Sequence, residues 1–193
     1  MFEFIRGRVV SKAPTHVAVD AGGIGYRLLI PVSTYERLPD EGEVSLLVHL
    51  HVREDEMRLY GFATAAERDL FELLLSVPGI GPATALLTLS SGSVDNIKGA
   101  IRDGNAEYLQ RIKGIGKKTA QRIVLELKGC LEETAALPCA EGAEGGAFND
   151  AILALVKLGY VRRAAEEAVR KAAAKLAGKA SVGNLVKESF KHL

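Results

Sequence analysis

Val77-Pro78-Gly79-Ile80-Gly81-Pro82-Ala83-Thr84-Ala85 and Ile112-Lys113-Gly114-Ile115-Gly116-Lys117-Lys118-Thr119-Ala120 are two copies of one pattern, and five of their nine positions coincide. In each copy an apolar residue leads into Gly-Ile-Gly and then into a helix-forming run. The two glycines permit a tight backbone turn, and the isoleucine between them anchors it. Because the first N–H groups of a helix lack intrahelical partners, each copy predicts a turn that can bind an anion, with phosphate as the obvious candidate.

One Gly-x-Gly turn alone would be weak support for this prediction, since a glycine-capped turn between two packed helices explains it equally well. Two copies 35 residues apart with the same flanks favour phosphate binding. The pattern resembles the helix-hairpin-helix motifs of proteins that hold DNA by its backbone. The residues predicted to lie at the phosphates are Gly79, Ile80, Gly81, Gly114, Ile115 and Gly116.

The charge distribution supports the second copy more than the first. The whole chain has a formal net charge of only +1. Between residues 98 and 128, however, eight basic residues face three acidic ones, which is a local excess of five positive charges. Lys117, Lys118 and Arg122 fall at the second turn, where an anion would lie. A solvated helix face is the alternative explanation for these charges.

Composition describes an ordinary globular protein of 193 residues, with 48% hydrophobic and 25% charged residues. The charged N-terminal residues do not fit a signal peptide, and no apolar run approaches the 18 residues of a membrane span, so a cytoplasmic protein is expected. Cys130 and Cys139 are expected to be free thiols. His49 and His51 share one face of a predicted strand without further ligands, so no metal and no cofactor are expected.

The order of predicted elements indicates a multidomain α+β protein that begins with a five-stranded OB-fold barrel over residues 1–63. Ala21-Gly22-Gly23-Ile24-Gly25 is typical of a hairpin connection. Five short strands with glycine-rich turns favour a small barrel, for which the OB-fold is the commonest solution. The strands are predicted at 2–10, 16–20, 26–31, 44–53 and 57–62.

A helical domain with both Gly-Ile-Gly copies is expected over residues 64–133. Thr64 and Glu67 form a capping box before an apolar stripe at helical spacing. Ser93 and Asn105 are predicted caps of two short helices, at 94–102 and 106–112, that connect the copies.

Two further segments complete the chain. Residues 134–146 are rich in Ala, Glu and Gly, which predicts a flexible linker. Residues 147–193 are expected to form a three-helix, UBA-like module that contacts a partner. Its helices are predicted at 149–158, 162–177 and 182–192, with Ser181 as the cap of the last.

With these parts in order, nearly the whole chain resembles the RuvA family, the junction-binding subunits of the bacterial branch-migration complex. The most specific segments are Gly22-Gly23-Ile24-Gly25-Tyr26, His51-Val52-Arg53-Glu54-Asp55, Leu59-Tyr60-Gly61-Phe62, both Gly-Ile-Gly copies and Leu155-Val156-Lys157-Leu158-Gly159-Tyr160.

The resemblance implies a non-catalytic tetramer, or a pair of tetramers, that holds a four-way (Holliday) DNA junction open during recombination, DNA repair and the SOS response to DNA damage. It implies the hexameric RuvB ATPase as the motor partner and the RuvC resolvase as a further partner. The turns around Gly79, Gly81, Gly114 and Gly116 would grip phosphates, with charge supplied by the second copy. The residues implied to contact the motor are Leu155, Leu158, Gly159 and Tyr160, although the apolar ones fit a core equally well.

Glu54 and Asp55 match the family's acidic pin, which is placed near the junction centre. Fixed carboxylates beside crossing strands would repel phosphates and discourage wrong pairing. Without the resemblance, a simple polar hairpin turn is the better explanation of residues 53–56. Two departures bear on function: Ala83 stands where many relatives carry lysine, and Glu56 adds a third acid that either strengthens the repulsion or shifts the pin.

Two other classes of protein compete with this interpretation. A helix-hairpin-helix DNA glycosylase would need a catalytic aspartate soon after the hairpin, but no Asp occurs between Asp103 and Asp150, and two cysteines cannot hold an iron–sulfur cluster by four thiolates. A phosphate loop for ATP is also missing from the sequence. A single-strand-binding OB protein would need aromatic stacking platforms, yet only 6% of residues are aromatic and none is Trp.

Overall fold

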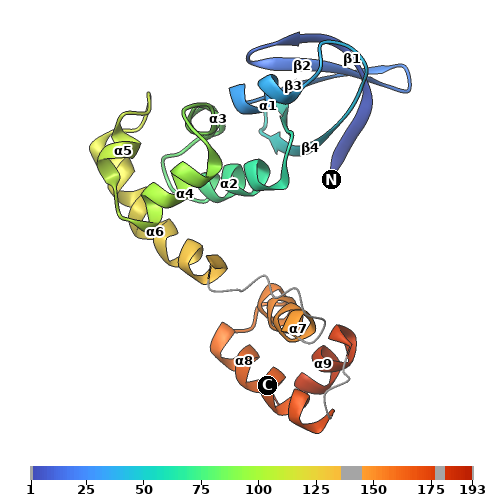
Figure 1. The fold of residues 1–193 in the computed structure, drawn as a ribbon, viewed down its shortest axis with the longest axis vertical. Coiled ribbons are helices and arrows are strands. Elements are labelled where there is room, and N and C mark those ends of the chain that lie inside the picture. Colours follow the sequence, from blue (N-terminus) through green and yellow to red (C-terminus); the bar gives the residue numbers. More distant parts are fainter. Residues whose placement is uncertain (1, 136–144, 177–180, 193) are drawn as a thin grey trace. The chain divides into compact units, whose positions relative to one another are not determined.

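The computed structural model describes residues 2–135, 145–176 and 181–192 (Figure 1). The chain forms two compact units, residues 1–133 and 134–193. The predicted boundary at residue 63, inside the first unit, stays a prediction. Most of the predicted linker, residues 136–144 with Cys139, lies outside the described residues.

The first unit opens with a closed barrel of five strands, which confirms the predicted architecture. The strands follow the order β1-β2-β3-β5-β4, and β1 closes the barrel by pairing with β4. Neighbouring strands are antiparallel except for β3 and β5, which are parallel. Gly22 and Gly23 form the predicted hairpin turn between β2 and β3. The strands are β1 (Phe4–Ala13), β2 (His16–Ala21), β3 (Ile24–Leu29), β4 (Glu43–Val52) and β5 (Met57–Phe62).

The barrel interior is filled by aliphatic side chains that alternate with outward-facing residues along the strands, as the period of two requires. Val17, Val19, Leu28 and Leu46 are completely buried there.

Helix α1 (Val32–Arg37) follows β3 and was not expected from the sequence. Contacts distant in the sequence hold it: Ser90 Oγ accepts a hydrogen bond from Val32 N at 3.1 Å. Its buried Thr34 donates from Oγ1 to Glu67 Oε2 at 3.1 Å. Tertiary hydrogen bonds therefore override the local preference of these β-branched and hydroxyl residues.

Glu67 joins the barrel to the first long helix, α2 (Ala65–Leu75). Its carboxylate is 2% exposed, and it completes the predicted capping box with Thr64. Besides the Thr34 hydroxyl, it accepts hydrogen bonds from Ser33 Oγ at 2.6 Å and from the backbone N–H groups of Ala63 and Thr64, both at 3.1 Å. A buried carboxylate needs such partners, so this network fixes the junction between strand β5 and α2.

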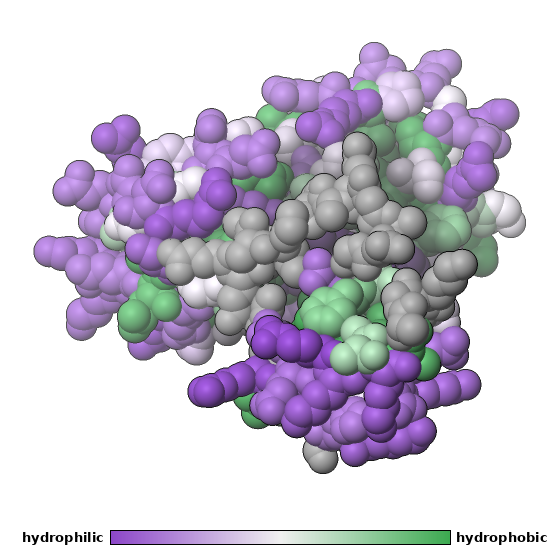
Figure 2. Space-filling view, turned by 60° about the horizontal axis from the view of Figure 1, so that its bottom comes forward, coloured by the Kyte–Doolittle hydropathy of each residue, from purple (hydrophilic) through white to green (hydrophobic). Residues whose placement is uncertain are grey.

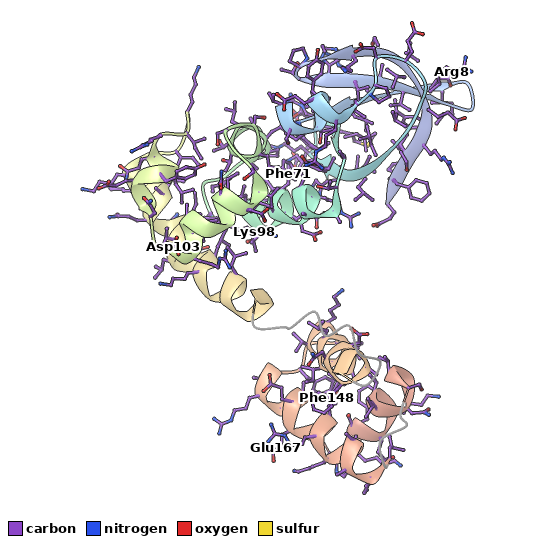
Figure 3. The ribbon with its side chains drawn as sticks, viewed as in Figure 1. Arg8, Phe71, Lys98, Asp103, Phe148 and Glu167 are labelled. Atoms are coloured by element: carbon purple, nitrogen blue, oxygen red, sulfur yellow. The ribbon has the colours of Figure 1, made fainter. Side chains whose placement is uncertain are left out.

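The helices after residue 64 in the first unit share one apolar core that reaches the barrel. Phe71, labelled in Figure 3, is completely buried and packs against Tyr60 and Phe62 of β5 with ring centroids 5.0 Å apart. Ser93 and Asn105 cap their helices through their side chains, as predicted. The remaining helices are α3 (Pro82–Ser90), α4 (Val94–Arg102), α5 (Ala106–Gln110) and α6 (Lys117–Ala135).

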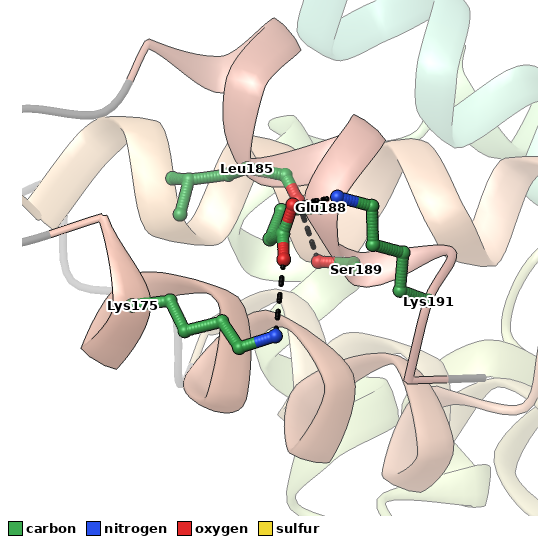
Figure 4. Close-up of polar contacts among 5 residues, drawn as sticks. All are labelled: Lys175, Leu185, Glu188, Ser189 and Lys191. Carbon is green, nitrogen blue, oxygen red and sulfur yellow. Dashed lines mark hydrogen bonds and ion pairs between the residues drawn. The ribbon is translucent and has the colours of Figure 1, made fainter.

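The described residues of the second unit form three helices, as expected: α7 (Gly145–Lys157), α8 (Arg162–Lys175) and α9 (Val182–Ser189). Ser181 caps α9 by accepting a hydrogen bond from Asn184 N. Figure 4 shows Glu188 between Lys191 and Lys175, whose Nζ atoms lie 2.6 and 3.3 Å from its oxygens. The hydrogen bond from Lys191 is the main cause that lowers the pKa of Glu188. These contacts connect α9 to α8 around a small core.

Candidate nucleic-acid interface

The two Gly-Ile-Gly turns have the same backbone geometry. Gly79 has φ +93° and Gly114 has φ +92°, a region that favours glycine. In each turn the isoleucine N–H donates to the residue three positions earlier, Ile80 to Val77 and Ile115 to Ile112, both at 3.0 Å. Ile80 and Ile115 are only 6% and 4% exposed and belong to the same core. The predicted anchoring role of both isoleucines follows from this burial.

Both turns lead directly into a helix, but they offer different numbers of backbone donors. The first intrahelical bonds are equivalent: Ala85 N donates to Gly81 O at 3.0 Å and Ala120 N donates to Gly116 O at 2.9 Å. The first four N–H groups of a helix have no intrahelical acceptor. In α3 one of these positions is Pro82, which has no N–H, whereas the equivalent residue of α6 is Lys117. The second turn therefore presents one more donor to an anion.

The two turns are close to each other in the first unit. A Cβ placed on Gly114 would lie 3.7 Å from Oγ1 of Thr84, a residue in the first turn of α3. Arg122 of α6 also reaches across, since its Nη1 donates to the carbonyl oxygen of Pro78 at 3.1 Å. The unpaired N–H groups at the starts of α3 and α6 therefore belong to two neighbouring turns.

The predicted basic residues divide into two groups. Lys117 and Lys118 are exposed at the start of α6, and neither takes part in an ion pair with any described side chain. The Arg122 side chain is 54% exposed, and its Nε lies 3.9 Å from Glu126 Oε1. Its contact with Pro78 places its charge beside the first turn, which has Ala83 where the second has Lys118.

The acidic residues lie at the tip of the hairpin between β4 and β5. Arg53 N donates to Glu56 O at 2.8 Å and closes the turn. Glu54 and Asp55 are exposed at this turn. Glu56 instead turns back to Arg58, whose Nε donates to Oε2 at 2.8 Å and whose pKa is raised by that hydrogen bond. The two family-matched carboxylates thus face solvent, and the third is paired.

In the second unit the predicted partner-binding residues differ in burial on the two sides of the end of α7. Leu155 is completely buried in the three-helix core, whereas Leu158 and Tyr160 are 62% and 39% exposed. Between them Gly159, with φ +98°, ends the helix. Phe190, the residue after α9, is 47% exposed and lies beside Tyr160, with ring centroids 6.1 Å apart.

Exposed apolar side chains also occur elsewhere on the described residues, among them Phe4, Met57 and Leu125. In the view of Figure 2 most side chains are hydrophilic, and hydrophobic ones reach the surface in several places. In the second unit Leu158, Tyr160 and Phe190 are exposed, and the last two are in ring contact; we call these three residues the tail surface.

The two strand histidines are candidate metal ligands because they share one face of β4. His49 and His51 are half-buried and have polar partners in Glu72 and Arg53. Within the described ranges no three His, Cys, Asp or Glu side chains are grouped as a metal site requires. No described helix is both long and apolar enough to cross a bilayer.

Sequence reasoning missed three contacts of the candidate site. The Arg122–Pro78 bond and the approach of Thr84 to Gly114 join residues far apart in the chain, so no local signal marks them. The pairing of Glu56 with Arg58 had a signal, because residues two positions apart on a strand share one face.

Comparison with known proteins covers almost the entire chain. Residues 1–61 match the RuvA N terminal domain, residues 71–128 match a SAM-like helix-hairpin-helix tandem, and residues 146–193 match the RuvA C-terminal domain. Similar proteins named "Holliday junction branch migration complex subunit RuvA" occur in several bacteria. The relative from Syntrophotalea carbinolica is 48% identical over 174 residues, which cover 88% of each chain.

Two further relatives with the same name extend this coverage. The protein from Solibacter usitatus is 47% identical over 184 residues, which cover 90% of each chain. The protein from Trichlorobacter lovleyi is 42% identical over 203 residues, which cover 100% of this chain and 99% of the relative. The similarity therefore includes the barrel, both Gly-Ile-Gly turns and the C-terminal module.

Proposed function

The chain belongs to the RuvA family, and on that premise we propose that it binds four-way DNA junctions through their phosphate backbones, as the non-catalytic subunit of a branch-migration complex. The observation that carries this proposal is the pair of Gly-Ile-Gly turns with equal φ angles and adjoining positions. Phosphate contacts fix position and do not report sequence, so binding is expected to show little base preference.

We assign the phosphates to the backbone N–H groups at the starts of α3 and α6. Lys117 and Lys118 add charge at the second turn, and Arg122 adds charge beside the first through its contact with Pro78. Charge-assisted hydrogen bonds are stronger than neutral ones, so the second turn supplies the larger share of affinity. Gly79, Ile80, Gly81, Gly114, Ile115 and Gly116 set the geometry.

Glu54 and Asp55 serve as the acidic pin near the junction centre. Their exposure at a tight hairpin turn supports this role, because charges that face solvent can act on approaching phosphates. Their negative charge repels the phosphates of DNA strands that would pass through the centre, which discourages pairing of the wrong strands. Replacing both by neutral residues is expected to preserve or increase junction binding while it disturbs branch migration.

We assign docking of the RuvB ATPase motor to the tail surface. Leu158 and Tyr160 are apolar and exposed, whereas buried Leu155 supports them from the core and Gly159 turns the chain between them. Exposed apolar side chains on a module of this size favour a protein partner. The motor supplies ATP hydrolysis, since this chain contributes binding alone.

The family also guides the assembly that we propose. The chain acts in the cytoplasm, where bacterial DNA lies, as a homotetramer or a pair of tetramers around the junction, with the RuvC resolvase as a further partner. Four copies would place four acidic hairpins near the junction centre and eight phosphate-binding turns on the four arms. Solution mass measured with and without junction DNA tests this stoichiometry.

The decisive experiment is a gel-shift competition between a four-way junction and linear duplex of the same sequence. Strong junction preference is expected, and equal affinity would contradict the proposed function. Binding is also expected to weaken with salt, with a log–log slope of about −0.9 per neutralised phosphate.

The motor assignment has a separate test. Deletion of the chain after Glu141 removes the three-helix module and is expected to abolish stimulation of the motor while DNA binding persists. In the full-length chain Leu158→Ala is expected to weaken stimulation, and Leu125→Ala, at an exposed leucine of α6, is the matched control. Unchanged stimulation by the truncated chain would refute the assignment.

A further inference from the structure

The acidic hairpin has three acidic residues in succession, and the structure treats the third differently from the first two. Glu54 and Asp55 are exposed at the turn. The Glu56 side chain is 35% exposed. Its Oε2 lies 2.8 Å from Arg58 Nε and 2.6 Å from Arg58 Nη2. Two guanidinium N–H groups therefore converge on one carboxylate oxygen.

The position of this pair follows from strand geometry. Residues two positions apart in an extended chain point to the same side, so Glu56 and Arg58 share one face of the hairpin. On β4, His51 is directly opposite Arg58 in the register and accepts a hydrogen bond from Arg53 Nε at 3.2 Å. Basic side chains of both strands thus lie beneath the acidic turn.

The pair changes the charge that the hairpin tip presents. The positive charge of Arg58 cancels the negative charge of Glu56, which leaves the two carboxylates of Glu54 and Asp55 at the turn. An exposed ion pair contributes little to folding stability. Its main effect is therefore on where charge is located, and that effect falls on whatever approaches the tip.

We propose that Arg58 is a positioning residue of the acidic hairpin, which holds the Glu56 carboxylate away from the tip and so limits the charge facing junction phosphates to two carboxylates. This inference rests on the proposed function, because tip charge alters affinity only where phosphodiester groups lie nearby. The ligand chemistry is the sugar–phosphate backbone of the strands at the junction centre. Without Arg58, Glu56 becomes a third repulsive carboxylate.

The test is a charge cycle in the full-length protein. Arg58→Met releases Glu56 and is expected to lower affinity for a four-way junction about threefold, whereas Glu56→Gln releases Arg58 and is expected to raise it about threefold. The double variant restores the original net charge and is expected to return to within about a factor of two of the unmodified protein. Affinity for linear duplex is expected to stay unchanged in all three.

Two controls separate this role from a merely structural one. Arg58→Lys keeps a cation beside Glu56 and is expected to retain most of the junction affinity. Arg27→Met removes an exposed cation from β3, outside the acidic hairpin, and is expected to change junction affinity less than Arg58→Met. Thermal melting of each variant reports whether the barrel has been destabilised.

The measured affinities distinguish a positioning role of Arg58 from a purely structural role. Single variants that shift junction affinity in the same direction, or a double variant that stays far from the unmodified protein, would overturn the role of Arg58. Equal loss of junction and duplex affinity with a lower melting temperature would also overturn it, in favour of a structural pair. If the unmodified protein itself shows no junction preference, the proposed function fails first and the inference fails with it.

Discussion

The two Gly-Ile-Gly turns share one backbone geometry but differ in charge and in donors. Both place glycine at φ near +90°, bury the central isoleucine and start a helix with equivalent hydrogen bonds. The first turn continues with Pro82 and Ala83, where the second continues with Lys117 and Lys118. Glycine and buried isoleucine thus determine the shape of the site, while the two residues that follow determine how strongly it attracts an anion.

The difference between the turns is partly offset by tertiary structure. Arg122 belongs to the helix of the second turn, yet its guanidinium donates to Pro78 of the first. The poorly charged turn therefore has a cation beside it that its own sequence does not supply. Variants of both turns can show whether shape, local charge or this shared arginine controls affinity.

The largest effect is expected from Gly114→Ala. Alanine at φ +92° is strained, whereas its Cβ would make only an ordinary contact with Thr84 Oγ1 at 3.7 Å, so the backbone strain disturbs the turn. We expect a stability loss of about 1–2 kcal/mol and a more than tenfold loss of junction affinity. Thermal melting and a binding titration measure the two quantities.

Two alanine variants serve as comparisons for Gly114→Ala. Gly116→Ala has open space around its Cβ and no positive φ, so its melting temperature is expected to stay unchanged. Gly79→Ala meets the same backbone strain in the weaker turn, and we expect a smaller loss of affinity. A larger loss for Gly79→Ala than for Gly114→Ala would reverse the ranking of the turns.

An intermediate effect is expected from exchanging charge at equivalent positions of the two turns. Lys118→Ala is expected to weaken junction binding roughly fivefold and to reduce the salt slope by about 0.9, the value for one phosphate. Ala83→Lys is expected to strengthen binding by a similar factor. Titrations over a series of salt concentrations measure both changes. Lys128→Ala, further along α6, is the control, and an equal effect there would mean that only net charge matters.

The smallest effect is expected from Arg122. Arg122→Met removes the hydrogen bond to Pro78 and the charge beside the first turn, and we expect about a threefold loss of junction affinity. Arg122→Lys keeps the charge without the planar donor group and is expected to lose less. NMR shifts of the Gly79 and Ile80 amides report whether the first turn moves. Shifts confined to the second turn would argue against the shared arginine.

Local signals predicted much of this fold. Thr64, Ser93, Asn105 and Ser181 cap helices as expected, because an N-cap depends on a few neighbouring residues. The barrel strands followed from alternation and turn residues, with shifts of a few residues at the ends. Both Gly-Ile-Gly turns were identified because the required conformation is encoded within nine residues.

Contacts between distant residues escaped prediction. Helix α1 contains Val32, Ser33 and Thr34, which favour other conformations, and it is held by Glu67 and Ser90. The position of Arg122 depends on a contact 44 residues away. Leu155 and Leu158 are equally apolar, and only the packing of three helices decides that one is buried and the other exposed.

The buried carboxylate of Glu67 has a mechanical consequence. Strand β5 carries one side of the acidic hairpin, and α2 begins the helical region that carries both Gly-Ile-Gly turns. Glu67 accepts hydrogen bonds at the point where strand passes into helix, and it also holds α1. The hairpin and the helical region are therefore joined through one buried, hydrogen-bonded carboxylate, and loss of that carboxylate is expected to loosen the hairpin relative to both Gly-Ile-Gly turns.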